Sequence, residues 1–597
     1  MLDREKFIFF IVIDAFGYKA LNRKIGNTAV TPFLNQIQNE SFFASNFYSP
    51  APYTEAAMVS VIGNILPLEK GGYILGNYCL DETLFEFLKK HNFSTLSTFS
   101  PYIADQANLR GVDDFIYTTL YDIQPLISYR FNYFNYLLKN KQAHIYDILI
   151  CQYLLEDALY SWLTQLKEIL AGSSTTRLLK TIASLNDHHQ LNMVLNLLEK
   201  EILTFIKDKK NYTISLLASP NKHPLIALNN LFLRSTRPSS PSIDFPEAKE
   251  ITHLISSEQD RINKILKKNY SFLTQYNYII NTTKIKGIKN GFRLAKKIYQ
   301  YWHNNLIVEA LNIYKNKVSL KNQLKFLLDQ LYNNNSKSLF AYLHADDFHL
   351  PSIYYTPYYK NQQEELLSAL NLLKHIDFNY YGNPAADLSA HYCDSCLSEF
   401  FSECLKSNKD VTIVISADHG YPLFQDPIRH ITYNQTYREA FHIPFIVINT
   451  QSRLASQHSS HFQSYIDVKK LLFNLLNKKE KVAELSTPSD SEYILCEYAG
   501  PGCPDIWRKD LWYTYIDANY RASFECSLYE SVTPSHCVDF FNLAIDPKET
   551  KATILNSDKK ILPIIAELAN TRRKYILKTN QSTNAFLDKV RKPDFLL

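Results

Sequence analysis

The sequence predicts an α/β protein with a mostly parallel central sheet, a long helical insertion and a small α+β subdomain at the C-terminal end. Two runs of β-branched and aromatic residues, Phe7 to Ile13 and Val411 to Ile415, are typical of fully buried strands. Strand-like and helical segments alternate before residue 120 and again after residue 337, as in βαβ units. Between these stretches the apolar residues follow helical spacing.

The first stretch, residues 1–120, supplies the N-terminal half of the predicted core. The strand FIFFIVI comes first, helices are expected over Thr31 to Glu40 and from Thr54, and the helical segment LFEFLKKH precedes the strand STLSTF. Residues 121–336 contain long segments rich in Leu, Ile, Lys and Asn, such as QYLLEDALYSWLTQLKEIL. Surface helices with one buried face account for this pattern, and a lid that selects the substrate is the functional alternative.

The second half of the core is expected over residues 337–490. Here SLFAYLHADDFH resumes the strand pattern, YCDSCLSEFFSECLKS is helical, and TIVIS and FHIPFIVIN are further strands. Residues 491–597 carry YILCEYAG, LWYTYIDANYRASFEC and DFFNLAIDP, which indicate a more antiparallel subdomain followed by a C-terminal helix.

Composition limits the class of protein and its partners. The chain has 597 residues, of which 46% are hydrophobic and 21% charged, so it is globular rather than disordered. The formal charge is +5 without a dense basic tract, which argues against a nucleic-acid partner. No apolar run is long enough for a signal peptide or a membrane span, although peripheral docking on a membrane stays open. Nine cysteines without a secretion signal indicate a reducing compartment, and we expect a cytoplasmic protein of undetermined oligomeric state.

Four polar residues stand just beyond apolar runs or at the start of a helix: Asp14, Thr54, Asp418 and His419. Open parallel sheets carry their functional residues at the carboxyl ends of the strands. Two carboxylates, an imidazole and a hydroxyl at one such edge would suit a divalent cation. Taken singly, Asp14 ends a strand and Asp418 with His419 forms a turn before Gly420, but together they favour a metal site.

The order of these segments resembles the sulfatase family of the alkaline phosphatase superfamily, over residues 1–120 and 337–580. The segments that carry the resemblance are, in chain order, the strand ending in Asp14, TPFLNQI, Thr54-Glu-Ala-Ala, GVDDFIY at Gly111, Asp347 to His349, SADHG, HIPFIVI at His442, and Asp539 to Thr550. The resemblance implies an alkaline-phosphatase-like α/β/α sandwich. It also implies that Asp14, Thr54, Asp418 and His419 hold one cation, which could be zinc, manganese, magnesium or calcium; a second ion is left open.

The nucleophile distinguishes this chain from true sulfatases. Those enzymes have a Cys or Ser followed by x-Pro-x-Arg, whereas this chain has Thr54-Glu55-Ala56-Ala57-Met58. An unmodified threonine resembles the nucleophile of phosphodiesterases and of phosphoglycerol and phosphoethanolamine transferases. Coordination by a cation would activate the hydroxyl, and the helix N-terminus would stabilise a bound anion. An N-cap role for Thr54 is the structural alternative.

Further candidates come from LHADDFHLP and from the segment after SADHG. By resemblance, His349 is the expected proton donor, and Asp347, Arg429 and His430 are expected to contact the substrate. His344 is expected to be a structural histidine at a strand end.

These observations predict a metal-dependent hydrolase or transferase that acts on a phosphate ester through a covalent phosphothreonine. A small molecule, glycan or lipid head group would carry the ester, and polysaccharide modification is suggested by family analogy only. The first alternative is a sulfuric ester hydrolase that works without formylglycine. The second is a catalytically silent module that binds an anionic glycan.

Overall fold

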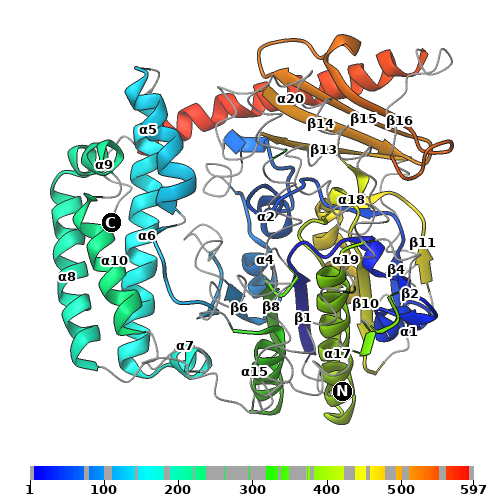
Figure 1. Cartoon of the computed structure of the whole chain (residues 1–597), viewed down its shortest axis with the longest axis horizontal. Helices are drawn as coiled ribbons and strands as arrows, with labels where there is room; N and C mark the ends of the chain where they lie inside the picture. The colour runs from blue at the N-terminus through cyan, green and yellow to red at the C-terminus, as the bar shows by residue number, and fades with distance from the viewer. Residues whose placement is uncertain are drawn as a thin grey trace.

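In the computed structural model, the described part of the chain forms an eight-stranded sheet, a four-stranded sheet and helices around them (Figure 1). The described residues are 6–72, 80–99, 110–124, 126–141, 145–180, 188–219, 222–236, 261, 295, 318–333, 338–348, 371–372, 374–376, 382–421, 437–451, 457–476, 492–499, 510–549 and 560–590.

The eight-stranded sheet has the order β11-β4-β10-β9-β1-β8-β6-β7. Its strands are β1 (Lys6–Ile13), β4 (Phe42–Ala44), β6 (Ser94–Phe99), β7 (Asp114–Tyr117), β8 (Leu339–Ala345), β9 (Asp410–Ser416), β10 (Phe445–Asn449) and β11 (Gln457–Ser459). Strand β1 pairs in parallel with β8 and β9, and β6 pairs in parallel with β8 and β7. Among the strands described in this sheet, β10 runs antiparallel to both neighbours. The predicted mostly parallel α/β sheet is confirmed.

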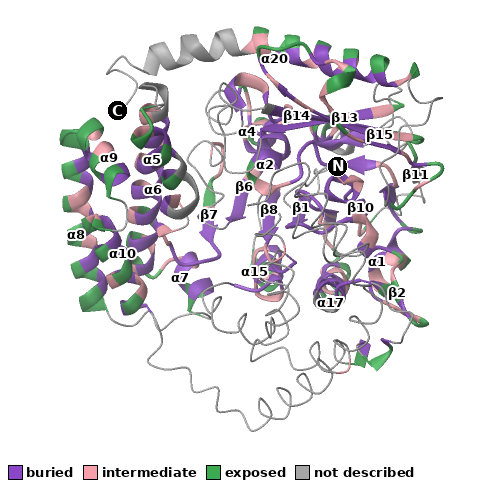
Figure 2. Cartoon of the chain, turned by 45° about the horizontal axis from the view of Figure 1, so that its top comes forward, coloured by how far each residue is buried: buried purple, intermediate pink, exposed green. Residues whose placement is uncertain are grey.

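Helices cover both faces of this sheet. Phe9 packs on Phe400 and the next residue, Phe10, packs on Tyr342, with ring centroids 5.6 Å apart in each pair. Because successive side chains of a strand point to opposite faces, the two contacts lie on opposite sides of the sheet. The covering helices are α1 (Pro32–Ile37), α15 (Leu320–Asn333) and α17 (Pro384–Lys406) on the Phe9 side, and α2 (Thr54–Gly63), α4 (Leu84–Lys90) and α19 (Val468–Leu476) on the other. Figure 2 shows the buried strands between these layers.

A group of helices lies beside the β7 edge of the sheet, on the left of Figure 1. They are α5 (Asn132–Lys139), α6 (Ile145–Ala171), α7 (Ser174–Leu179), α8 (His188–Lys207), α9 (Lys209–Ala218) and α10 (Pro224–Ser235). Gln165 of α6 fastens this group to the chain just after β7, because it accepts from Tyr121 N at 2.7 Å and donates to Thr119 O at 2.8 Å. No helix within the described ranges is both long and apolar enough to cross a lipid bilayer.

The C-terminal part is an antiparallel sheet with a long helix, as predicted. The strands are β13 (Tyr493–Ala499), β14 (Asp510–Asp517), β15 (Tyr520–Ser527) and β16 (Cys537–Asn542), and the helix is α20 (Leu562–Val590). Arg572 of α20 forms ion pairs at 2.7 Å with Glu497 of β13 and with Glu69 of the core. Glu497 also accepts a hydrogen bond from Leu68 N at 3.0 Å. These contacts fix the C-terminal part against the core.

Candidate active site and metal centre

Three neighbouring strands bring polar residues to one edge of the central sheet. Asp14 follows β1, Asp418 and His419 follow β9, and His344 is the penultimate residue of β8. Val12 of β1 is in register with His344 on one side and with Ser416 on the other, so the three strands end at the same level. The expected gathering of strand-end residues is therefore present, at the edge where parallel sheets bind ligands.

Backbone groups hold Asp418 in place. Its Oδ1 accepts hydrogen bonds from Ala15 N at 2.9 Å and from His419 N at 2.8 Å. Ala15 has φ of 65°, a left-handed conformation that is uncommon for a residue with a Cβ, and such strain is concentrated at functional sites. Asp418 Oδ2 is buried and has no hydrogen-bond partner among the described residues. Because a buried charge is costly unless it is paired or binds a metal, this carboxylate oxygen favours a bound cation.

The hydroxyl of Thr54 lies next to the side chains of Asp14 and His419. Its Oγ1 lies 3.4 Å from each carboxylate oxygen of Asp14 and 3.3 Å from His419 Nε2. Tyr53, which precedes the helix, is tied to the C-terminal sheet because its hydroxyl donates to Ala499 O at 2.5 Å. Tyr53 occupies the N-cap position of α2 and Thr54 is the first helical residue, with no side-chain cap hydrogen bond at this end. The Thr54 hydroxyl is therefore directed to the site rather than used as a cap.

The tautomer of His419 follows from its contacts. Its Nδ1 lies 2.9 Å from Gly420 O, and since a carbonyl only accepts, Nδ1 carries a proton, while Nε2 faces Thr54 Oγ1 at 3.3 Å and Asp14 Oδ1 at 3.5 Å. Gly420 N donates to Ala440 O at 2.8 Å. A Cβ at Gly420 would lie 2.1 Å from Glu439 O, so only glycine permits this approach. A histidine oriented by a backbone carbonyl is a common arrangement of metal ligands.

His344 is a candidate ligand that the sequence analysis did not propose. Its Nε2 lies 3.5 Å from Asp14 Oδ2, and its Nδ1 lies 3.2 Å from the buried hydroxyl of Tyr342. Burial disfavours the charged imidazolium, but the carboxylates of Asp14 and Asp418 outweigh it and raise the pKa of His344 above its ordinary value. The sequence analysis placed it correctly at a strand end, but the pairing of that strand with β1, which brings His344 to Asp14, could not be read locally.

These side chains fit a divalent cation. One ligand atom each from Asp14, His344 and Asp418 lies within 4.8 Å of the others, and all three residues are buried. His419 is buried as well, whereas Thr54 is partly exposed. Two carboxylates with imidazole nitrogens suit zinc, manganese or magnesium. Asp418 Oδ2, which has no hydrogen-bond partner among the described residues, is an independent reason to expect a cation.

Of the remaining predicted site residues, Asp347 is among the described residues of the structure. Asp347 is buried, and its Oδ2 accepts from Leu320 N at 2.9 Å at the start of α15. His349, Arg429 and His430 lie outside the described residues. Their predicted roles as proton donor and substrate contacts stay predictions.

One family model matches the sequence. The sequence model of sulfatases covers residues 241–477, a range that includes Asp347, Asp418 and His419 but not Asp14 or Thr54. A search among curated protein sequences gave no match.

Solved structures of remote similarity cover nearly the whole chain. The lipoteichoic acid synthase LtaP from Listeria monocytogenes shares 11% identity, with 98% of this chain and 92% of that chain covered and a TM-score of 0.42. The phosphonate monoester hydrolase of Agrobacterium radiobacter shares 9%, with 97% and 96% covered and a TM-score of 0.45. A protein in the alkaline phosphatase superfamily from Vibrio parahaemolyticus shares 11%, with 96% and 88% covered and a TM-score of 0.42.

Proposed function

We propose that this chain, which the sequence model of sulfatases matches over residues 241–477, is a metal-dependent enzyme that cleaves or transfers a phosphate ester with Thr54 as its nucleophile. The observation that carries the proposal is the position of Thr54 Oγ1, 3.3 Å from His419 Nε2 and 3.4 Å from both oxygens of Asp14. A partly exposed hydroxyl thus lies among buried acidic and imidazole groups, which is how weak hydroxyl nucleophiles are activated. The favoured substrates are phosphodiesters of the phosphoglycerol or phosphoethanolamine type.

The cation would be held by Asp14, Thr54, Asp418 and His419, with His344 as an additional candidate. When bound, a divalent cation supplies Lewis acidity, which lowers the pKa of a coordinated hydroxyl and offsets charge on phosphate oxygens. Asp418 is prepared for this role because two backbone N–H groups hold Oδ1 and leave Oδ2 available. His419 is prepared because the contact of its Nδ1 with Gly420 O leaves Nε2 facing Thr54 and Asp14.

The reaction proceeds in two displacements at phosphorus. The Thr54 oxygen forms a bond to phosphorus, its proton passes to solvent, and the bond between phosphorus and the leaving alcohol breaks. The departing oxygen takes a proton from a general acid, for which His349 is the candidate. Water or an acceptor alcohol then attacks the phosphothreonine, loses its own proton and restores the Thr54 hydroxyl.

The start of α2 orients the phosphate group. The first backbone N–H group with a helical partner is that of Ala57, which donates to Tyr53 O at 3.0 Å. The N–H groups of the preceding positions in the first turn therefore have no acceptor within the helix. Together with the positive end of the helix dipole, they favour an anion next to Thr54.

Phosphorus is favoured over sulfur because the nucleophile is a threonine without the Cys/Ser-x-Pro-x-Arg context. Turnover of bis(p-nitrophenyl) phosphate and p-nitrophenyl sulfate by the same preparation compares the two reactions. We expect faster turnover of the phosphate; the opposite order would favour a sulfuric ester hydrolase. Absence of both activities from a protein that holds no stoichiometric metal would favour a silent binding module.

Mass spectrometry of the enzyme quenched during turnover of a phosphodiester tests the covalent step. We expect a phosphorylated peptide that contains Thr54, lost in Thr54→Ala and retained in Thr28→Ala, which makes the same change at a threonine of a distant turn. Turnover without phosphothreonine would instead indicate direct attack by water, and unchanged turnover by Thr54→Ala would refute the assignment of the nucleophile.

A further inference from the structure

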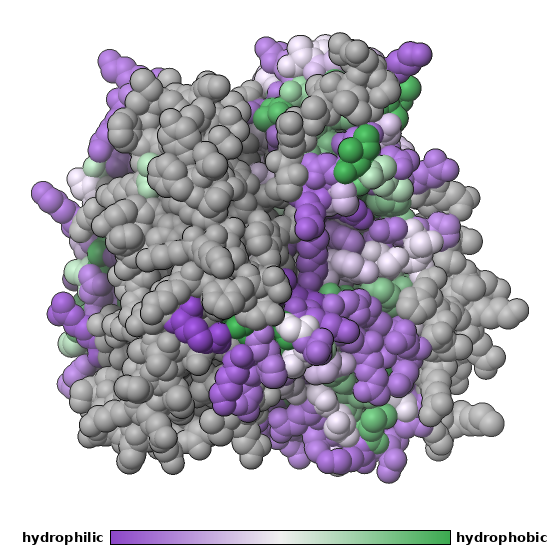
Figure 3. Space-filling view, turned by 45° about the vertical axis from the view of Figure 1, so that its right-hand side comes forward, coloured by the Kyte–Doolittle hydropathy of each residue, from purple (hydrophilic) through white to green (hydrophobic). Residues whose placement is uncertain are grey.

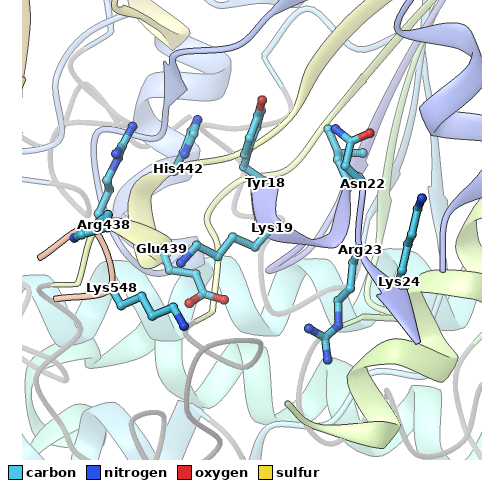
Figure 4. Close-up of a pocket in the computed structure, with 11 residues that line it drawn as sticks. Tyr18, Lys19, Asn22, Arg23, Lys24, Arg438, Glu439, His442 and Lys548 are labelled. Carbon is cyan, nitrogen blue, oxygen red and sulfur yellow. The ribbon is translucent and has the colours of Figure 1, made fainter. Parts of the chain in front are cut away.

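A cavity of about 640 Å³ is lined by chain segments that adjoin the candidate active site (Figure 4). One wall is formed by residues 18–24, shortly after Asp14, another by α18 (Arg438–Phe441) and His442, and a third by residues 547–548. Tyr18 N donates to His442 O at 2.8 Å, which joins the first two walls. Because Gly420 N donates to Ala440 O, the second wall is also tied to the residue after His419. The cavity and the metal centre thus share their supporting backbone.

The lining of this cavity is rich in positive charge. The basic side chains that line it are Lys19, Arg23, Lys24, Arg438 and Lys548, and Glu439 is the one acidic residue among the described residues of the lining. Arg23 is paired with Asp387 of α17, to which its guanidinium donates at 2.9 Å. The described lining residues thus combine five basic residues with one acidic residue, and the carboxylates of Asp387 and Glu549 lie against them. Figure 4 shows Lys19, Glu439 and Lys548 next to one another. On the face of the molecule drawn in Figure 3, hydrophilic side chains are prominent among the coloured residues.

The aromatic residues of the lining are neutral and rigid. Tyr18 stacks on His442 with ring centroids 3.9 Å apart. Burial, followed by the charges of Arg438 and Lys19, lowers the pKa of His442 well below its ordinary value. His442 Nε2 lies 2.8 Å from Ser45 O, to which it donates its proton. The lowered pKa of His442 thus reflects in part the positive charges of Arg438 and Lys19. Arg438 is itself held in place, because its guanidinium lies over the ring of Tyr48 and donates to the Tyr48 hydroxyl.

We propose that this cavity is a second anion-binding site, which takes the phosphate group of a monoester or diester. Arginine and lysine are the side chains that proteins use to bind phosphate, through charge-assisted hydrogen bonds. The volume is in the range of small-molecule sites and accommodates a phosphate with an attached glycerol or sugar. The phosphate could belong to a second unit of the substrate, in which case the inference rests on the proposed function, or it could be free inorganic phosphate.

Titration of inorganic phosphate into the full-length, chelator-treated protein by calorimetry tests the site without turnover. We expect the double variant Lys19→Gln/Lys548→Gln to bind phosphate at least about tenfold more weakly, because each lost charge-assisted hydrogen bond contributes substantially. The control Lys200→Gln/Lys207→Gln removes the same charge from exposed positions of α8 and should bind as the wild type does. The variant Lys19→Arg/Lys548→Arg keeps the positive charge and should retain phosphate binding. Retained binding would show that the Gln variant binds phosphate weakly because it lacks the charge.

Equal phosphate affinity in the wild type and in Lys19→Gln/Lys548→Gln would overturn the proposal. Equal weakening in the α8 control would also overturn it, because the effect would then be one of overall charge. Raising the salt concentration should weaken wild-type binding, as expected for charges at a partly open site.

Kinetics distinguish the two sources of phosphate. If the ligand is a second phosphate of the substrate, Lys19→Gln/Lys548→Gln raises KM about tenfold for a glycerophosphate dimer and leaves KM for bis(p-nitrophenyl) phosphate unchanged. If the ligand is free phosphate, the variant needs about tenfold more inorganic phosphate to alter turnover of bis(p-nitrophenyl) phosphate. The trapped phosphothreonine remains a separate test, so the second site can fail while the proposed function stands, and the reverse.

Discussion

Replacing Asp418 by asparagine should have opposite effects on the metal-free and the metal-bound protein. Asp418 and Asp14 are both buried and contribute ligand atoms that lie within 4.8 Å of each other. Without a cation, two such carboxylates repel each other, so Asp418→Asn should stabilise the metal-free protein. With a cation available, the same change removes a ligand and should abolish the stabilisation that the metal provides.

The size of the repulsion follows from the separation. At 4.8 Å, the upper limit of the separation, and an effective dielectric constant of about 20, two unit charges repel by about 3.5 kcal/mol. Protonation of His344, whose pKa is raised beside these carboxylates, reduces this value at lower pH. A cation present at a hundred times its Kd stabilises the wild type by about 2.7 kcal/mol, which Asp418→Asn should lose.

Thermal unfolding with chelator and with added Mn²⁺, Zn²⁺ or Mg²⁺ measures both effects, and elemental analysis gives the metal content. We expect the variant to melt a few degrees above the wild type in chelator and to show no rise with metal. Asp394→Asn is a matched control, because Asp394 is a buried carboxylate that accepts from the backbone N–H groups of Phe33 and Leu34 and is not among the grouped ligand residues. Its response to metal should equal that of the wild type. A less stable metal-free Asp418→Asn that still holds stoichiometric metal would refute the reasoning.

Substitutions at three positions give independent tests. Thr54→Ser, which keeps the hydroxyl, should retain measurable turnover, whereas Thr54→Ala should lose at least about 10³-fold in kcat; equal loss in both would contradict a nucleophilic role. His344→Gln should weaken metal binding by about 10–100-fold in equilibrium dialysis, and unchanged affinity would show that His344 only packs. Burial raises the pKa of Asp157 to about 7 from 3.8, and its Oδ2 has no hydrogen-bond partner among the described residues. Because the native state keeps a proton that the unfolded chain releases, wild-type stability should fall as pH rises from 4 to 7, by up to about 4 kcal/mol. Burial also raises the pKa of Asp394 to about 7, so Asp157→Asn should reduce the difference between denaturant unfolding at pH 5 and at pH 8 without abolishing it; an equal difference in the wild type and in Asp157→Asn would contradict the prediction.

Local sequence was sufficient for the class of fold and for part of the site. The strands β1 and β9 were recognisable because a strand buried on both faces must be apolar along its length. Asp14, Asp418 and His419 were recognisable because a polar residue directly after such a run lies at a sheet edge. Thr54 was identified by resemblance and by its place at the start of a helix.

The sequence alone determined which residues stand at strand ends, since burial and periodicity are properties of neighbouring residues. Only the tertiary structure decided which strand ends meet. The order β9-β1-β8 brings His344 to Asp14. The packing of β13 against the core places Ala499 O where it accepts a hydrogen bond from Tyr53, the residue before Thr54. The basic cavity likewise combines residues from three distant parts of the chain. Such contacts depend on how whole elements pack, and no local pattern of residues encodes that packing.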